Sequence, residues 1–147
     1  MITPELARAL RTAGLRWHPR SGDAFRIETA DGSDDVFTVS EMTVEVHEFP
    51  TGRQIGFNGT TEWALDSVAI ADTLWLPHEA QLRELLRDGF RRLEVSNGLF
   101  VVVAVVRAVE RAYEAETAED AYGEAVLDLI VQTLVTDTDG ADVGPAE

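Results

Sequence analysis

The spacing of apolar residues divides the chain into segments with a helical period and segments with a strand period. Near the start, Leu6 and Leu10 fall on one helical face. Thr3 can cap this helix, and Pro4 suits its first position. Gly14 supplies a left-handed stop. We therefore predict a first helix that ends just before Gly14.

The next part of the chain reads as strands separated by polar turns. Phe25–Ile27 follows a turn rich in helix breakers, and Asp31–Asp35 forms a second polar turn. Apolar and polar residues alternate over residues 42–47, which is typical of a half-buried antiparallel strand. A turn at residues 50–52 then lets residues 54–57 return as the hairpin partner.

The centre of the chain carries signals for a short helix, a brief extended segment and a longer helix. Threonines at 60–61 can cap a short helix that runs through Val68. Leu74–Leu76 is predicted as a brief extended segment, since Pro77 disfavours helix in the residue before it. Pro77 then opens a longer helix that is expected to stop at Gly89. Its apolar stripe consists of Leu82, Leu85, Leu86 and Phe90.

The last third begins with a strong hairpin signal, because Asn97-Gly98 separates the apolar segments 93–96 and 99–106. Residues 107–116 suit a helix by composition, whereas a short returning strand fits the topology better, and both stay open. The sequence Thr117–Asp120 resembles a capping box and opens a final helix. The apolar residues of that helix are Ala121, Tyr122, Ala125, Val126, Leu129 and Ile130.

These elements predict an α+β protein. Residues 1–135 are expected to form a single domain, an antiparallel sheet of hairpins with an N-terminal helix, central helices and a C-terminal helix. Residues 136–147 are acidic and are expected to form a disordered tail. A chain of 147 residues with 45% hydrophobic content is long enough to bury one core.

The basic residues and cysteine content exclude several enzyme classes. All 12 basic residues are arginine, and the chain contains no cysteine. A P-loop ATPase and pyridoxal chemistry both need a lysine, and thiol chemistry needs a cysteine. His78-Glu79 begins like a zinc protease motif, but Leu82 stands where the second histidine must be. We therefore expect neither a metal nor a cofactor.

The formal net charge of −15 at pH 7 argues against nucleic acid and anionic membranes as partners. No apolar run is long enough to cross a bilayer. We therefore expect a soluble cytoplasmic protein.

The segment Arg53–Asp66, followed by Leu74–Pro77, is the best candidate for a functional surface. It holds two of the three tryptophans, an Asn-Gly turn and two acidic residues. Tryptophan is enriched in interface hot spots, although large aromatic residues more commonly pack in the core. The predicted binding residues are Arg53, Asn58, Glu62, Trp63, Asp66 and Trp75.

These features favour a non-catalytic interaction or accessory module with a protein partner that the sequence does not identify. One alternative is a small enzyme in which Glu62 and Asp66 act as acid and base beneath Trp75. Another alternative is an acidic protein that mimics nucleic acid. Homodimerisation through a sheet edge stays open under each of these readings.

Three segments, Met42–Val68, Leu74–Leu86 and Ala121–Leu127, are similar to short actinobacterial proteins of unknown function that often carry the label pilus assembly protein CpaE. An arginine-only basic set with abundant Ala, Val and Asp fits that origin. The resemblance extends to about Val135, implies a shared fold and transfers no catalytic residue. It does not reach the MinD-like CpaE ATPases, which need a lysine. Trp75–Leu82 also resembles prophage-associated proteins, so the implied setting is a pilus, secretion or phage-related system.

Overall fold

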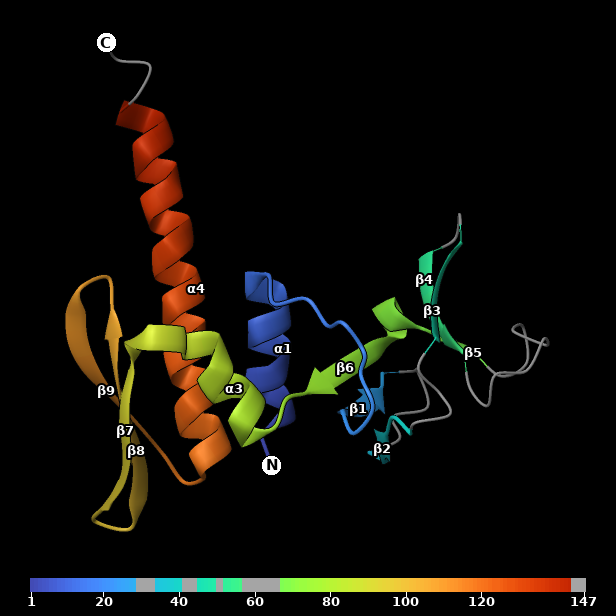
Figure 1. The fold of residues 1–147 in the computed structure, drawn as a ribbon, viewed down its shortest axis with the longest axis horizontal. Coiled ribbons are helices and arrows are strands. Elements are labelled where there is room, and N and C mark those ends of the chain that lie inside the picture. Colours follow the sequence, from blue (N-terminus) through green and yellow to red (C-terminus); the bar gives the residue numbers. More distant parts are fainter. Residues whose placement is uncertain (29–33, 41–44, 50–51, 57–66, 144–147) are drawn as a thin grey trace. The chain divides into compact units, whose positions relative to one another are not determined.

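The computed structural model describes residues 1–28, 34–40, 45–49, 52–56 and 67–143. It confirms the α+β class, with antiparallel sheets, an N-terminal helix and a C-terminal helix (Figure 1). The chain groups into two compact units. The helical unit contains Met1–Leu15 and His78–Glu147, and the strand unit contains Arg16–Pro77.

The helical unit combines three helices with one sheet of three strands among its described residues. Its helices are α1 (Pro4–Ala13), α3 (Glu79–Leu86) and α4 (Ala118–Val143), and a 3-10 turn, η3 (Arg87–Gly89), follows α3. Its strands are β7 (Phe90–Ser96), β8 (Leu99–Val106) and β9 (Val109–Ala115), paired antiparallel in that order. Helix α4 packs against β8 and β9, while α1 and α3 pack against α4 (Figure 1).

The ends of α1 lie where the sequence predicts them. Thr3 is the N-cap, and its hydroxyl oxygen accepts a hydrogen bond from the Leu6 amide at 3.4 Å. Pro4 occupies the first turn, and Gly14 ends the helix with φ of 120°. Leu6 and Leu10 are both buried. The apolar face therefore packs into the core while the two ends are capped.

Both turns of the β7–β8–β9 sheet have two residues in the left-handed region. Asn97 and Gly98 have φ values of 53° and 79°, which confirms the predicted hairpin. Arg107 and Ala108 have φ values of 52° and 63°, so the chain turns back at once into β9. Residues 109–115 are therefore a returning strand rather than a helix.

Helix α3 is shorter than its apolar stripe predicts. It begins at Glu79 after the N-cap His78 and ends at Leu86. Phe90 is the first residue of β7, so placing it on the helical stripe was wrong. The physical reason lies in Gly89, where an added Cβ would lie 2.7 Å from the carbonyl oxygen of Val105. That close approach brings the chain onto the sheet at this point.

The final helix starts as predicted and continues further than predicted. The Thr117 hydroxyl oxygen accepts a hydrogen bond from the Asp120 amide at 3.1 Å. Helix α4 then runs to Val143, whereas a disordered tail was expected from residue 136. Extending an existing helix costs far less than nucleating one, and Gly140 alone lowers helix stability by only about 1 kcal/mol.

The core of the helical unit is formed by β8 and the helices around it. Val102, Ala104 and Val106 alternate along β8 and are fully buried. Leu82 of α3 and Tyr122 of α4 are equally enclosed. The other buried apolar side chains of this unit are Ile2, Leu6, Ala7, Leu10, Leu86, Val101, Val103, Ala118, Ala121, Ala125 and Val126.

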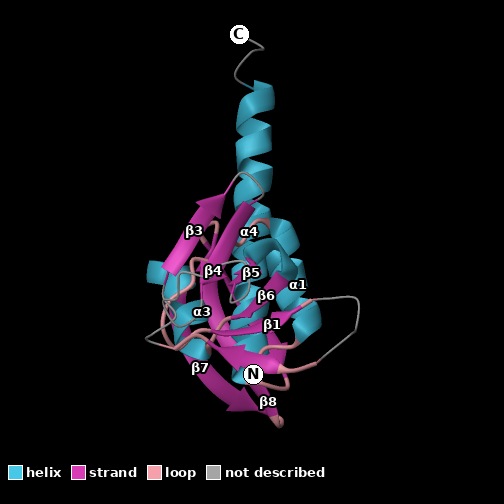
Figure 2. Ribbon diagram, turned by 90° about the vertical axis from the view of Figure 1, so that its right-hand side faces the viewer, coloured by secondary structure: helices cyan, strands magenta, loops and turns pink. Residues whose placement is uncertain are grey.

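The strand unit contains two antiparallel sheets among its described residues (Figure 2). The first has the order β2-β1-β6, with β1 (Ala24–Ile27), β2 (Val36–Thr38) and β6 (Thr73–Leu76). The second has the order β3-β4-β5, with β3 (Glu45–Phe49), β4 (Gly52–Gly56) and β5 (Ser67–Ala69). A 3-10 turn, η2 (Ile70–Asp72), leads from β5 into β6.

The β3–β4 pair confirms the predicted central hairpin, with Phe49 opposite Gly52. The predicted short helix was wrong at its end, because Val68 lies in β5 opposite Ile55. Pairing between two β-branched residues favours strand at this position. Residues 60–66, which carry the rest of that predicted helix, lie outside the described residues.

Candidate functional site

An aromatic row crosses all three strands of the β2-β1-β6 sheet. Phe37 of β2 lies opposite Phe25 of β1, and Phe25 lies opposite Trp75 of β6. The rings of Phe25 and Phe37 are stacked with centroids 5.6 Å apart. Trp17 adds a fourth ring, 5.2 Å from Phe25. We call Phe37, Phe25 and Trp75 the aromatic row.

The aromatic row is buried at its centre and open at one end. Phe25 is fully buried and belongs to a core cluster with Trp17 and Val39. Phe37 has 42% of its surface exposed, and its neighbour Val36 is also exposed. Among the described strands, β2 lies at the edge of its sheet and is three residues long. The exposed ring of Phe37 is therefore held in place by a buried ring on the adjacent strand.

Trp75 is the one predicted binding residue whose side chain the structure describes. It is partly buried and packs against the cluster of Trp17, Phe25 and Val39. Its indole nitrogen is enclosed and has no hydrogen-bond partner among the described residues. Trp75 is therefore the end of the aromatic row that packs against the core. This position agrees with the packing alternative given for it above.

The other predicted binding residues are not brought together by the described part of the chain. Arg53 lies in β4, opposite Glu48 of β3. Asn58, Glu62, Trp63 and Asp66 lie outside the described residues. The alternative site formed by Glu62 and Asp66 lies outside them as well.

Sequence reasoning missed the exposed residues of β2. The segment Val36–Val39 contains apolar side chains at both odd and even positions, so simple alternation does not separate a buried face from an exposed face. In the structure Val39 is buried, while Val36 and Phe37 are exposed. The signal that could have found them is the shortness of this apolar run, which suits an edge strand.

Asp23 holds the turn before the aromatic row. It is buried, and its Oδ2 accepts hydrogen bonds from the Trp17 indole N–H and the Arg20 amide, each at 2.9 Å. The Val39 amide donates to the Asp23 carbonyl oxygen at 2.8 Å. A buried carboxylate with these partners fixes the position of Trp17, which packs on Phe25. Its role is structural support of the aromatic row.

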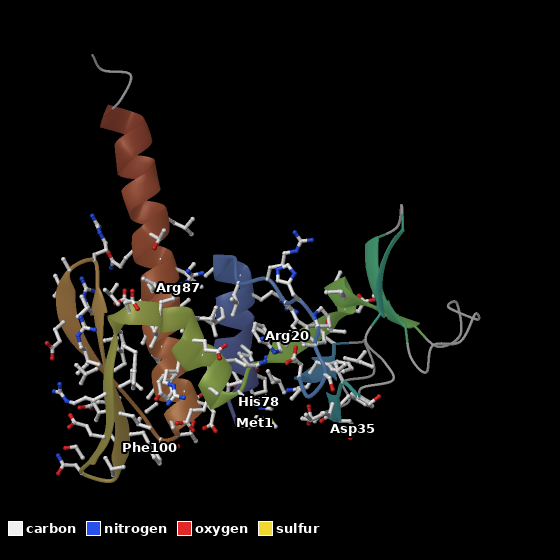
Figure 3. The ribbon with its side chains drawn as sticks, in the orientation of Figure 1. Met1, Arg20, Asp35, His78, Arg87 and Phe100 are labelled. Carbon is white, nitrogen blue, oxygen red and sulfur yellow. The ribbon has the colours of Figure 1, made fainter. Side chains whose placement is uncertain are left out.

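A polar hollow lies near the start of α3 in the helical unit. Figure 3 labels His78, one of its lining residues. The hollow has a volume of about 310 Å³ and is lined by His78, Glu79, Ala80, Arg83 and Glu119. The described residues contain no group of three or more His, Asp or Glu side chains placed to hold a metal ion. The hollow mixes two carboxylates with one guanidinium group, and its open form offers little enclosure for chemistry.

Asp128 joins α4 to the sheet of the helical unit. Its Oδ2 accepts hydrogen bonds from the Tyr113 hydroxyl at 2.6 Å and from Arg111 at 3.2 Å. Its Oδ1 accepts from the Gln132 side chain at 3.2 Å. Burial raises the pKa of Tyr113 well above its ordinary value, and the hydrogen bond from Tyr113 to Asp128 and the negative charge of Asp128 raise it further. Arg111, Tyr113 and Gln132 each donate to Asp128, which indicates a structural anchor.

No helix in the described ranges combines the length and apolar content needed to span a membrane. Comparison with protein-family models, with curated proteins and with solved structures found no match to this chain.

Proposed function

We propose that this protein is a cytoplasmic, non-catalytic interaction module, and that the exposed end of the aromatic row forms part of its binding surface. The observation that carries the proposal is the position of Phe37, exposed on an edge strand and stacked on buried Phe25. An aromatic side chain that is already ordered loses little conformational entropy on binding. Aromatic residues are also enriched at the centres of interfaces.

The edge position of β2 supports the same proposal. An edge strand presents unpaired backbone groups, and a partner strand or loop can use them. Val36 and Phe37 place apolar surface beside those groups. Full burial of an exposed side chain of this kind is worth roughly 1.5–3 kcal/mol. Val36 and Phe37 are 44% and 42% exposed, so a partner that buried both would gain less than about half of that from each. The sequence resemblance suggests a component of a pilus, secretion or phage-related system as that partner.

The ion pairs made by Arg26 of β1 and Arg92 of β7 support an interaction protein more than a nucleic-acid mimic. Several carboxylates are paired with arginines, including Arg26–Asp34 at 2.7 Å and Arg92–Glu110 at 3.5 Å. Arg92 also lies 3.6 Å from Glu94 on the same strand. Positive and negative charges that alternate over a surface, as they do here, are typical of ordinary solvated faces. A protein that mimics nucleic acid instead needs a continuous row of negative charges, as on a phosphate backbone.

Affinity capture with the full-length tagged protein tests this proposal. Wild type is compared with Phe37→Ser and with the matched control Val95→Ser, which alters an exposed apolar residue on β7. A protein captured by wild type and by Val95→Ser, but lost with Phe37→Ser, supports the proposed surface. Equal capture by all three proteins would contradict it. Circular dichroism and tryptophan fluorescence establish that each variant is folded.

A further inference from the structure

Helices α1 and α4 lie side by side and point in the same direction (Figure 1). The Thr3 amide donates to Asp120 Oδ1 at 2.8 Å, across 117 positions of sequence. Leu6 lies against Gly123, and these two residues are separated by the same number of positions as Thr3 and Asp120. With this register the last residue of α1 comes level with Ile130. Everything in α4 after Ile130 therefore lies beyond the end of α1.

The projecting part of α4 carries an apolar stripe beyond the region that α1 covers. The thirteen residues from Val131 to Val143 extend the helix by roughly 20 Å. Figure 1 shows α4 continuing past the end of α1. Val131 and Leu134 are 42% and 52% exposed. They follow Leu127 and Ile130 at helical spacing, on the side where Gly123 meets α1.

The charge of α4 has one sign throughout. The helix contains no basic residue, and its acids are Glu119, Asp120, Glu124, Asp128, Asp137, Asp139 and Asp142. The C-terminal end of a helix already carries partial negative charge, so acids there are unfavourable unless cations approach. A second copy of α4 would bring like charges together. Charge complementarity therefore favours a basic occupant.

Helix α1 shows what kind of segment packs on this side of α4. Its apolar residues Leu6 and Leu10 are buried, and its charged residues are Glu5, Arg8 and Arg11, one acid and two bases. We propose that the projecting end of α4 is a docking site for a basic amphipathic helix of a partner protein. That helix continues along α4 from where α1 ends and places its apolar side chains on Val131 and Leu134. This site is separate from the aromatic row.

Two synthetic helical peptides test the docking site on the full-length protein. Both have a leucine face, and the polar face is arginine in one and glutamate in the other. Fluorescence anisotropy measures the binding of each labelled peptide. The arginine peptide should bind, and the combined Val131→Gln and Leu134→Gln variant should weaken it by about tenfold or more. Thr133→Gln, an exposed neighbour in α4, should leave its affinity unchanged.

The dependence on Val131 and Leu134 separates docking from general attraction to an acidic protein. If the double variant bound the arginine peptide as tightly as wild type does, the proposed docking site would be wrong. Equal binding of the two peptides would overturn it as well. Sedimentation showing that wild type self-associates through these two residues would assign the surface to a second copy instead. Phe37→Ser should not alter peptide binding, so this site and the aromatic row are tested independently.

Discussion

Leu6 packs so closely on Gly123 that a Cβ added at Gly123 would lie 2.7 Å from the Leu6 Cδ2 atom. The Ile2 Cδ1 atom would be 3.2 Å from the same Cβ. This close approach, together with the Thr3–Asp120 hydrogen bond, sets the register between α1 and α4. The length of α4 that projects past α1 follows from that register.

Gly123→Leu should therefore destabilise the helical unit by about 1–3 kcal/mol, because the larger side chain forces α1 away from α4. Gly123→Ala is the matched control. The flexible end of Leu6 can move away from one methyl group, and alanine favours helix by about 1 kcal/mol over glycine. Urea unfolding followed by far-ultraviolet circular dichroism measures both. Similar stability of the leucine variant and wild type would contradict the packing described here.

Gly89→Ala should destabilise the same unit by about 1–3 kcal/mol for a different reason. The added methyl would meet the backbone carbonyl oxygen of Val105 at 2.7 Å, and a backbone atom cannot rotate away. Ser96→Ala, on the exposed end of β7, should change stability by no more than about 0.5 kcal/mol. Urea unfolding again gives the measurement. If Gly89→Ala left the free energy of unfolding unchanged, the chain would not approach β8 this closely.

The ionisation of the two tyrosines can be followed without interference near pH 10, because the chain has no lysine and no cysteine that would titrate in the same range. Burial raises the pKa of both Tyr113 and Tyr122 above 10.0 in the folded protein. Their contribution to stability is fully present below pH 10.0, the unfolded value, and is lost as the pH rises through the folded values. Absorbance at the tyrosinate band should show less ionisation at pH 10 in the folded protein than in urea, where about half is expected. Equal ionisation at pH 10 with and without urea would contradict the burial of these rings.

Asp23→Ala should destabilise the strand unit by about 1–3 kcal/mol, since it removes the acceptor of one buried and one partly buried hydrogen bond. All three tryptophans lie between residues 16 and 77, so tryptophan fluorescence reports this unit selectively. The far-ultraviolet signal of α1, α3 and α4 should persist in the variant under conditions where its tryptophan signal changes. An unchanged unfolding midpoint by fluorescence would show that Asp23 does not hold Trp17.

Local signals predicted the regular elements well. Thr3, Pro4 and Gly14 mark α1, and Asn97-Gly98 marks the β7–β8 turn. Each of these residues acts on its own neighbours, so sequence alone is enough. The turn at Arg107-Ala108 has the same geometry, but neither residue is a usual one for the left-handed region. Residues 107–116 could not be assigned for that reason.

Features that depend on distant contacts were not predictable. Val68 is a strand residue because β4 pairs with it, and Phe90 leaves the helix because Gly89 meets β8. The exposure of Phe37 follows from its place at a sheet edge, and that depends on which strands pair. Of the predicted binding residues, Trp75 lies across Phe25 from this exposed ring and packs against the core cluster that supports it.

Photo-cross-linking tests the proposed binding surface most directly. A photoreactive amino acid replaces Phe37 in one full-length protein and Val95 in another, and both are irradiated in cells that express them. Mass spectrometry then identifies the attached proteins. We predict a defined partner attached through position 37 and absent from position 95. The same set of proteins from both positions, or none from position 37, would contradict the interaction surface on β2.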